Sequence, residues 1–124
     1  MLIEKIAQGD IFCNISSLTI TELFTKPYRL KDFSKISIFE EFINSFPNST
    51  IQSVDYNVAK LAARLRTNYS LGTPDSILLS TAVVTKSEYF VTNDNSFKNI
   101  EIEGLKILVL DEYFKWHYNH CRLR

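Results

Sequence analysis

The sequence has no excess of charge of either sign, because its 124 residues hold 14 Lys and Arg against 14 Asp and Glu. This balance argues against a protein coated in basic charge. It leaves room for a local basic patch beside an acidic one, since steering depends on where charges lie as well as on their sum. The chain also lacks repeats and low-complexity segments, and 45% hydrophobic residues with 13% aromatic residues are typical of a globular protein. The length predicts a single domain over residues 1–124.

Cysteine is scarce, and the two that occur, Cys13 and Cys121, fit no metal-binding or redox spacing. Cys13 falls in an apolar run and is expected to act as a small apolar residue with a reduced thiol. The N-terminus lacks the apolar core of a signal peptide, and no apolar run approaches the length of a membrane span. We therefore expect a cytoplasmic protein without a membrane segment.

Helical and strand patterns alternate along the chain. We expect helices over residues 2–8, 17–26, from 33 or 37 to 46, 56–71 and 73–84, with strands over 11–15, 50–54, 89–92 and 106–110. An aromatic-rich helix or tail is expected from residue 111. Strands separated by helices imply a parallel sheet with right-handed crossovers. The predicted fold class is therefore α/β, a three-layer parallel sheet with helices on both faces.

Several residues should mark the ends of these helices. The expected N-caps are Ser16 or Ser17, Asp55, Thr73 and Asp94. Pro27 should end the helix that begins near residue 17, because proline cannot continue an α-helix. Pro74 should take the first helical position after Thr73.

Three acidic residues, Glu22, Asp75 and Asp94, are expected at one edge of this sheet. Glu22 lies six residues past a cap, roughly 9 Å along a helix that follows the first strand. Asp94 directly follows the third predicted strand, and Asp75 opens the helix that leads into it. In parallel α/β sheets, ligands bind outside the carboxyl ends of the strands. Each acid also has an ordinary reading: Glu22 as a surface residue, Asp75 as a partner of the helix dipole, and Asp94 as an N-cap.

Gathered carboxylates repel one another, and a divalent cation relieves this repulsion. Magnesium prefers oxygen ligands and needs only one or two direct carboxylates. The arrangement therefore suggests metal-assisted cleavage of a phosphodiester, with Mg²⁺ or Mn²⁺ held mainly by Asp75 and Asp94 and with Glu22 completing the cluster.

Three stretches of this sequence resemble the PIN domain: residues 16–23 (SSLTITEL), 65–82 (LRTNYSLGTPDSILLSTA) and 90–97 (FVTNDNSF). The likeness is greatest to the small bacterial ribonuclease toxins of type II toxin–antitoxin systems. It implies a metal-dependent ribonuclease whose acidic quartet binds magnesium or manganese, with Glu22, Asp75 and Asp94 as the second, third and fourth acids. It also implies RNA as substrate, an antitoxin protein as partner, and a homodimer.

The chain departs from this family pattern at its start. The family opens with an apolar-apolar-Asp-Thr-Asn strand, which gives the first acid and the central strand, whereas Met1 falls within what resembles the following helix. We therefore expect a PIN-like domain that is N-terminally incomplete, through a late start assignment or a truncated gene. Two strands with unpaired edges would make it less stable than a complete member or lead it to borrow a strand from a partner.

The missing acid keeps a second reading open, a catalytically dead PIN-like module that binds RNA or an antitoxin-like protein. A phosphoacceptor regulatory domain would need an Asp at the end of a central strand and an early pair of acids, and neither is seen. Nucleophilic catalysis of the Ser/His or Cys/His kind is unsupported, because no motif joins a histidine to a nucleophile.

Basic and polar residues beside the acids are candidates for substrate contact. The candidates are Arg64, Arg66, Thr92 and Asn93, with further basic residues at Lys26, Arg29, Lys31 and Lys60. Contacts of Lys and Arg with phosphates give salt-dependent affinity that is largely independent of sequence. A solvated helix face explains Lys60 at least as well, an ion pair explains Arg66, and turn chemistry explains Thr92 and Asn93. A zinc site at His117, His120 and Cys121 has only three ligands and is a weak reading beside an aromatic tail.

Overall fold

The structure, a computed structural model, describes residues 2–110 of the chain. The order of elements is α1 (Leu2–Ala7), β1 (Cys13–Ser16), α2 (Ser17–Arg29), α3 (Phe33–Ser45), β2 (Ser49–Gln52), α4 (Tyr56–Tyr69), α5 (Thr73–Val84), β3 (Tyr89–Thr92), the 3₁₀ turn η1 (Asn95–Phe97) and β4 (Lys106–Val109). Alternation of helices with strands confirms the α/β class.

The four strands form two parallel pairs. β1 pairs with β2, with Cys13 opposite Ser49, and β3 pairs with β4, with Tyr89 opposite Lys106. Within residues 2–110 no ladder joins the two pairs, so the strands do not form the single sheet that the alternation predicted. Each of β1 and β3 therefore keeps one edge without a neighbouring strand in the part of the chain that the structure describes.

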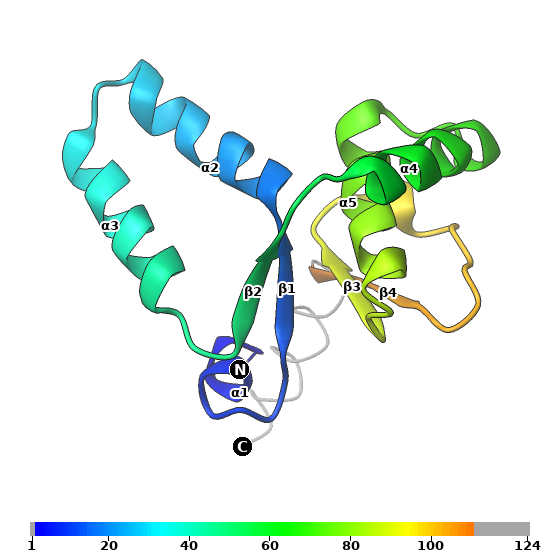
Figure 1. Cartoon of the computed structure of the whole chain (residues 1–124), viewed down its shortest axis with the longest axis horizontal. Coiled ribbons are helices and arrows are strands. Elements are labelled where there is room, and N and C mark those ends of the chain that lie inside the picture. The colour runs from blue at the N-terminus through cyan, green and yellow to red at the C-terminus, as the bar shows by residue number, and fades with distance from the viewer. Residues whose placement is uncertain (1, 111–124) are drawn as a thin grey trace, which may run out of the picture.

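One helix connects the two strand pairs. α5 lies against both β1 and β3, and it packs most extensively on α4. Figure 1 shows the α2–α3 hairpin on one side of β1 and β2, with α4, α5, β3 and β4 on the other. A side-chain hydrogen bond also crosses between the pairs, from Asn14 Nδ2 in β1 to Ser87 Oγ just before β3, at 3.4 Å.

The main hydrophobic core lies in the half that contains α4, α5, β3 and β4. Its buried members are Leu65, Leu71, Leu79, Ala82, Phe90, Phe97, Ile100 and Leu105. The rings of Phe90 and Phe97 lie 5.1 Å apart between centroids. Ser80 is fully buried among these apolar side chains and donates from Oγ to the carbonyl oxygen of Val58 at 2.7 Å, which ties α5 to α4.

The α2–α3 hairpin has a smaller apolar contact of its own. Phe24 and Phe39 meet edge to face at 6.0 Å between ring centroids, and Ile36 and Pro27 are buried. Many of its large apolar side chains remain exposed: Leu23, Tyr28, Leu30, Phe33, Ile38 and Phe42. Little of the hairpin's apolar surface is thus covered by the other described elements.

Three predicted caps are confirmed by hydrogen bonds. Ser16 Oγ accepts from the backbone N–H of Leu18 at 3.2 Å, and Asp55 Oδ1 accepts from that of Val58 at 2.9 Å. Asp94 caps η1 in the same way. These side chains satisfy backbone donors that a helix start leaves without an intrahelical partner.

Two predicted helix ends are wrong. Pro27 does not end α2, which runs to Arg29. A proline so close to the end of a helix removes one hydrogen bond, and its carbonyl oxygen accepts from the N–H of Asp32 at 2.9 Å. The N-cap of α5 is Gly72 rather than Thr73, because Ser70 ends α4 in a left-handed conformation and only three residues lie between the helices.

The first strand also begins later than predicted. Asp10 and Ile11 donate their N–H groups to the carbonyl oxygen of Lys5, so the chain is still turning where the apolar run suggested a strand. Phe12 is consequently 61% exposed. Cys13, expected to act as a small apolar residue, is half-buried, and this burial raises the pKa of its thiol.

Two further expectations concern the chain ends and the membrane. The helix or tail from residue 111, with His117, His120 and Cys121, lies outside the described residues. Among the helices of residues 2–110, none has the length and apolar character needed to cross a membrane.

Candidate functional site

Asp94 sits in the turn that follows β3, where two hydrogen bonds fix it. Its Oδ1 accepts from the N–H of Ser96 at 2.9 Å, and its own N–H donates to Thr92 Oγ1 at 3.1 Å. The bond from Ser96 lowers the pKa of the exposed Asp94 carboxyl. Asp94 is therefore held as a charged carboxylate at the carboxyl end of β3.

Asp75 lies in the first turn of α5 and is partly buried. Its pKa is raised, first by this burial and second by the negative charge of Asp94. The second cause shows that the two carboxylates are close enough to repel each other. The charge of Asp94, at the end of β3, therefore acts on Asp75 at the start of α5.

Glu22 is not gathered with this pair. It lies exposed on α2, in the hairpin half of the molecule. Across residues 2–110 no group of three or more His, Cys, Asp or Glu side chains is placed to hold one metal ion. In the described residues, the three predicted acids therefore do not form one metal-binding group. Glu22 lies on α2, whereas Asp75 and Asp94 belong to α5 and the turn after β3.

The pair Asp75 and Asp94 fits a hard divalent cation. Magnesium takes oxygen ligands, keeps several of its waters, and is commonly bound through one or two carboxylates. Within residues 2–110 the pKa of Asp75 is raised by burial and by Asp94, and no Lys or Arg there lowers it. These two side chains would hold the ion, and Asp94 has an oxygen besides the one that accepts from Ser96.

Thr92 and Asn93 lie in the same turn. The Thr92 hydroxyl accepts from the N–H of Asp94, so the turn chemistry expected for it is present. Asn93 is exposed beside Asp94. Ser96 escaped the sequence reasoning, although an Asp followed two residues later by a polar N–H donor is the spacing of an Asx turn.

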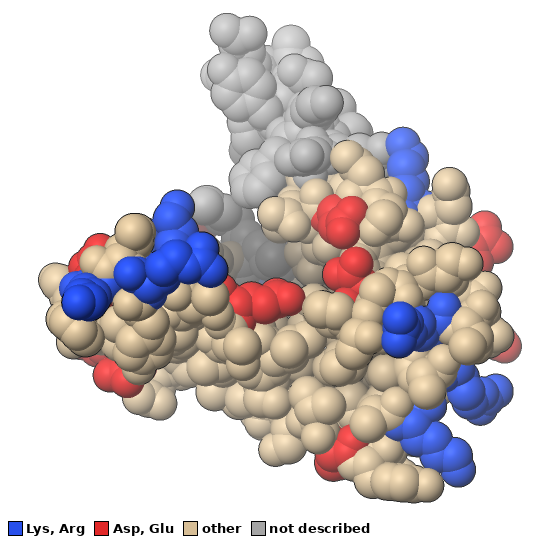
Figure 2. All heavy atoms as spheres, turned by 90° about the horizontal axis from the view of Figure 1, so that it is seen from above, with Lys and Arg blue, Asp and Glu red and all other residues tan. Residues whose placement is uncertain are grey.

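Basic side chains flank the acidic ones on the face seen in Figure 2. Acidic groups lie near the middle of this face, and Lys and Arg lie on both sides of them. α4 carries exposed Lys60, Arg64 and Arg66, and α2 ends with Lys26 and Arg29. The balanced total charge is therefore divided into acidic and basic areas.

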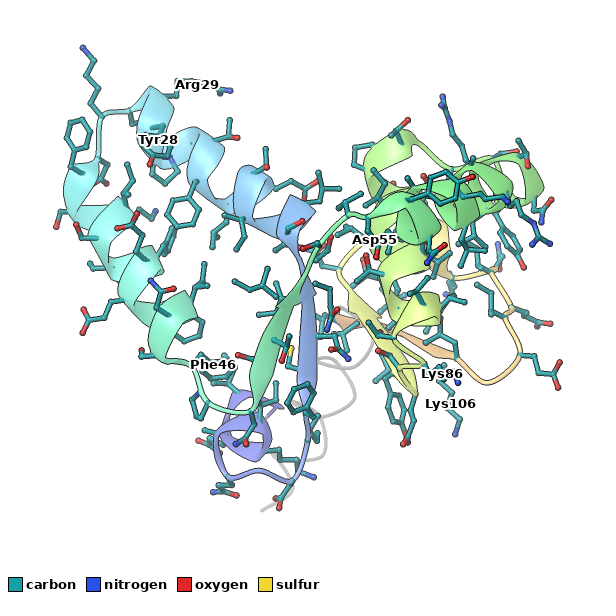
Figure 3. All side chains as sticks on the ribbon, in the orientation of Figure 1. Tyr28, Arg29, Phe46, Asp55, Lys86 and Lys106 are labelled. Atoms are coloured by element: carbon teal, nitrogen blue, oxygen red, sulfur yellow. The ribbon has the colours of Figure 1, made fainter. Side chains whose placement is uncertain are left out.

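Other basic groups lie away from this face. In Figure 3, Lys86 and Lys106 project at the amino ends of β3 and β4, whereas Arg29 lies at the far end of α2 and Asp55 at the start of α4. Lys86 and Lys106 therefore lie at the opposite ends of β3 and β4 from Asp94.

Arg66 also borders a cavity beside α5. It lines a cavity of about 630 Å³ between α4 and the first turn of α5, together with small residues such as Ala62, Ala63 and Ser76. Asp75 is in that same first turn. Asp75 itself does not line this cavity.

A model of the PIN domain family matches residues 2–103. The chain belongs to the PIN domain family. Membership confirms the resemblance drawn from the three sequence stretches and supports a nuclease-type function in general, since PIN domains generally depend on divalent metal ions. No curated protein and no solved structure matches the chain.

Proposed function

We propose that this PIN domain is a metal-dependent endoribonuclease of the toxin kind, which hydrolyses RNA phosphodiester bonds with Mg²⁺ or Mn²⁺. The observation that carries the proposal is the pairing of Asp75 with Asp94 at the carboxyl end of β3, where the charge of one raises the pKa of the other. Two mutually repelling carboxylates are stabilised when a divalent cation binds between them.

Each residue of the site has a distinct part. Asp75 and Asp94 bind the cation, and Thr92 and Ser96 hold Asp94 in place through their hydrogen bonds. The cation, when bound, lowers the pKa of a coordinated water and stabilises charge on the phosphate. Glu22, on α2, would become a third acid of this site only if α2 came closer to the pair than it stands in residues 2–110.

The cations of α4 and α2 serve to attract RNA. Lys60, Arg64 and Arg66 on α4 are exposed, and Arg66 lines the cavity that α4 shares with the first turn of α5. Because Lys and Arg displace counterions from phosphates, binding should weaken as salt rises. Replacing Arg64 and Arg66 with Gln should reduce the slope of log affinity against log salt by about one for each phosphate that is no longer neutralised.

Cleavage of a fluorescent single-stranded RNA tests the proposal. Wild-type chain, Asp75→Asn and Asp10→Asn are compared in Mg²⁺ and in EDTA. Asp10 is a matched control, since it is an exposed acid in the turn before β1. We expect Asp75→Asn to lose activity by at least about 100-fold, because changing a residue that merely supports a metal ligand already costs up to about that much. Asp10→Asn should be as active as wild type. Equal activity of Asp75→Asn and wild type would remove Asp75 from the mechanism.

A second candidate is a binding module of the same fold without catalysis. It is favoured by one observation, that no third acid joins Asp75 and Asp94 within the described residues. Such a module would bind RNA or an antitoxin-like protein. For this module, as for the nuclease, we propose a cytoplasmic homodimer. It predicts salt-dependent RNA binding with no cleavage in Mg²⁺ or Mn²⁺, which a filter-binding assay run beside the cleavage assay would reveal.

A further inference from the structure

The cavity between α4 and the first turn of α5 has a floor of small apolar side chains. Ala59, Ala62 and Ala63 of α4 line it, and its volume is about 630 Å³. Residues three and four apart lie on one face of a helix, so these three side chains are neighbours. Sites for small molecules commonly enclose about 300–1,000 Å³, with mostly apolar walls and a few polar groups. The cavity therefore has the size and the apolar floor of a ligand site.

Polar groups of the cavity are free to bind a ligand. Arg66 lines it, and within residues 2–110 no hydrogen bond or ion pair engages the guanidinium of this side chain. Ser70 and Thr73 line it as well, and in the same part of the chain their hydroxyls have no hydrogen-bond partner. A guanidinium can pair with a phosphate or stack on a nucleobase, and a hydroxyl can donate or accept.

The helix that forms the floor is basic. Residues 56–74 include Lys60, Arg64 and Arg66 and no acidic residue. Of these three cations only Arg66 lines the cavity. An anionic ligand is therefore favoured over a cationic one. It would meet one cation in the cavity and further cations along the same helix.

The cavity and the acidic pair share the first turn of α5. Thr73 and Ser76 line the cavity and Asp75 does not, so Asp75 belongs to another side of this helix. A helix with its side chains is about 10–12 Å across. A strand of linked nucleotides with one phosphate at Asp75 and Asp94 can therefore pass the start of α5 and place a nearby nucleotide in the cavity.

We propose that this cavity is a base-binding subsite, which takes one unstacked nucleotide of the single-stranded RNA that is cleaved at Asp75 and Asp94. The base would lie over the alanine floor, and Arg66 would stack on it or pair with its phosphate. The inference rests on the proposed nuclease function. It adds to that function a contact that selects the RNA by a nucleotide near the cleavage point.

Methyl NMR on the whole chain, with alanine methyl groups labelled in ¹³C, tests the proposal. The probes are hexanucleotides of A, of C, of U and of alternating G and U, and the control is an abasic ribose-phosphate hexamer. All are added in EDTA, so that RNA is not cleaved. An aromatic base close to a methyl group shifts its signal. We expect at least one base-bearing hexamer to shift the signals of the alanine floor and to leave those of Ala7 in α1 and Ala82 in the core unchanged.

Fluorescence anisotropy in the same buffer compares the affinities. At least one base-bearing hexamer should bind about fivefold or more tightly than the abasic one, the lower end for one stacked base. Ala63→Leu should remove this preference, because it fills the cavity from an exposed helix position where leucine is tolerated. The matched control is Asn68→Leu. Asn68 is exposed on α4 and does not line the cavity, so this variant should keep the preference.

Two arginines of α4 separate recognition of a base from attraction of phosphate. Arg64 does not line the cavity, so Arg64→Gln should weaken binding of the base-bearing and abasic hexamers by the same factor. Arg66→Gln should in addition reduce the preference for the base-bearing hexamer.

Four results would overturn the proposal: no shift at the alanine floor, an equal shift with the abasic hexamer, an unchanged preference in Ala63→Leu, or equal effects of the two arginine variants on the preference. A peptide of six glutamates that gives the same shifts and displaces the RNA would assign the cavity to an acidic protein instead. Uridine monophosphate that binds as tightly as the hexamers would assign it to a free nucleotide.

The measurements use the chain with residues 111–124 present. If that segment fills the cavity, the floor signals do not respond to RNA and the proposal is wrong. No readout here needs Mg²⁺ or cleavage. Failure of the subsite therefore leaves the proposed nuclease untouched, whereas failure of the nuclease shows in the cleavage assay with Asp75→Asn.

Discussion

Magnesium binding by Asp75 and Asp94 should be measurable as stabilisation of the fold, independent of any substrate. The charge of Asp94 raises the pKa of Asp75, so the two carboxylates oppose each other when no cation is bound. A site that exists only in the folded chain stabilises it by about 1.4 kcal/mol when free Mg²⁺ is about ten times the dissociation constant. With about 2.1 cal/mol/K of unfolding entropy per residue, a chain of 124 residues should then melt about 5 °C higher.

Thermal unfolding followed by circular dichroism at pH 7 would measure this shift, with EDTA as the reference. Asp75→Asn removes one ligand and the repulsion together. The raised pKa means that the folded chain holds the Asp75 proton more tightly than the unfolded chain does. The folded wild-type chain therefore loses stability as pH rises through the raised pKa of Asp75. Asp75→Asn has no such charge and should avoid this loss.

In EDTA at pH 7, Asp75→Asn should consequently melt no lower than wild type, and it should lose the response to Mg²⁺. Asp10→Asn, in the turn before β1, should respond as wild type does. Equal Mg²⁺ stabilisation of wild type and Asp75→Asn would refute the assignment of the metal to this pair, whatever the cleavage assay gives.

Three further outcomes follow from the contacts of α4 and α5. Asp94→Asn should bring the pKa of Asp75 down toward the ordinary carboxyl range, as seen by carboxyl ¹³C NMR, though burial will keep part of the shift; an unchanged pKa would mean that the two groups do not interact. Ser80→Ala should destabilise the chain by about 1 kcal/mol in urea unfolding, because it deletes a buried bond to Val58, and a change near zero would contradict that role. Asp55→Ala should cost about 1 kcal/mol through loss of the cap on the N–H of Val58, whereas Asp55→Asn should retain most of it.

Local signals in the sequence were sufficient for most elements. Asp55 and Asp94 are caps because a short acidic side chain can reach the N–H groups just ahead of it, and that depends on a few neighbouring residues only. The apolar spacing of Val58, Ala62 and Leu65 is borne out by their burial. The electrostatic effect of Asp94 on Asp75 agrees with the sequence argument that a helix feeding a parallel strand begins at the edge where that strand ends.

The errors arose where a turn or a tertiary contact competed with local propensity. Pro27 signals a helix end, yet its ring is buried and α2 continues to Arg29. Phe12 is part of an apolar run, yet the turn before it leaves its side chain in solvent. That β1 and β3 would lack a common ladder could not be judged from the helical and strand patterns, since these say which segments are extended but not which ones pair.

The separation of Glu22 from the acidic pair has the same origin as the free strand edges. Asp75 and Asp94 both belong to the half built from α4, α5, β3 and β4, so their meeting needs no pairing between β1 and β3. Glu22 is on α2, which follows β1 and also packs against α5, so its position relative to Asp94 is set by the packing of α2 and β1 on the other half. Between these strands the side-chain bond from Asn14 to Ser87 and the packing of α5 are weaker restraints than a hydrogen-bonded ladder.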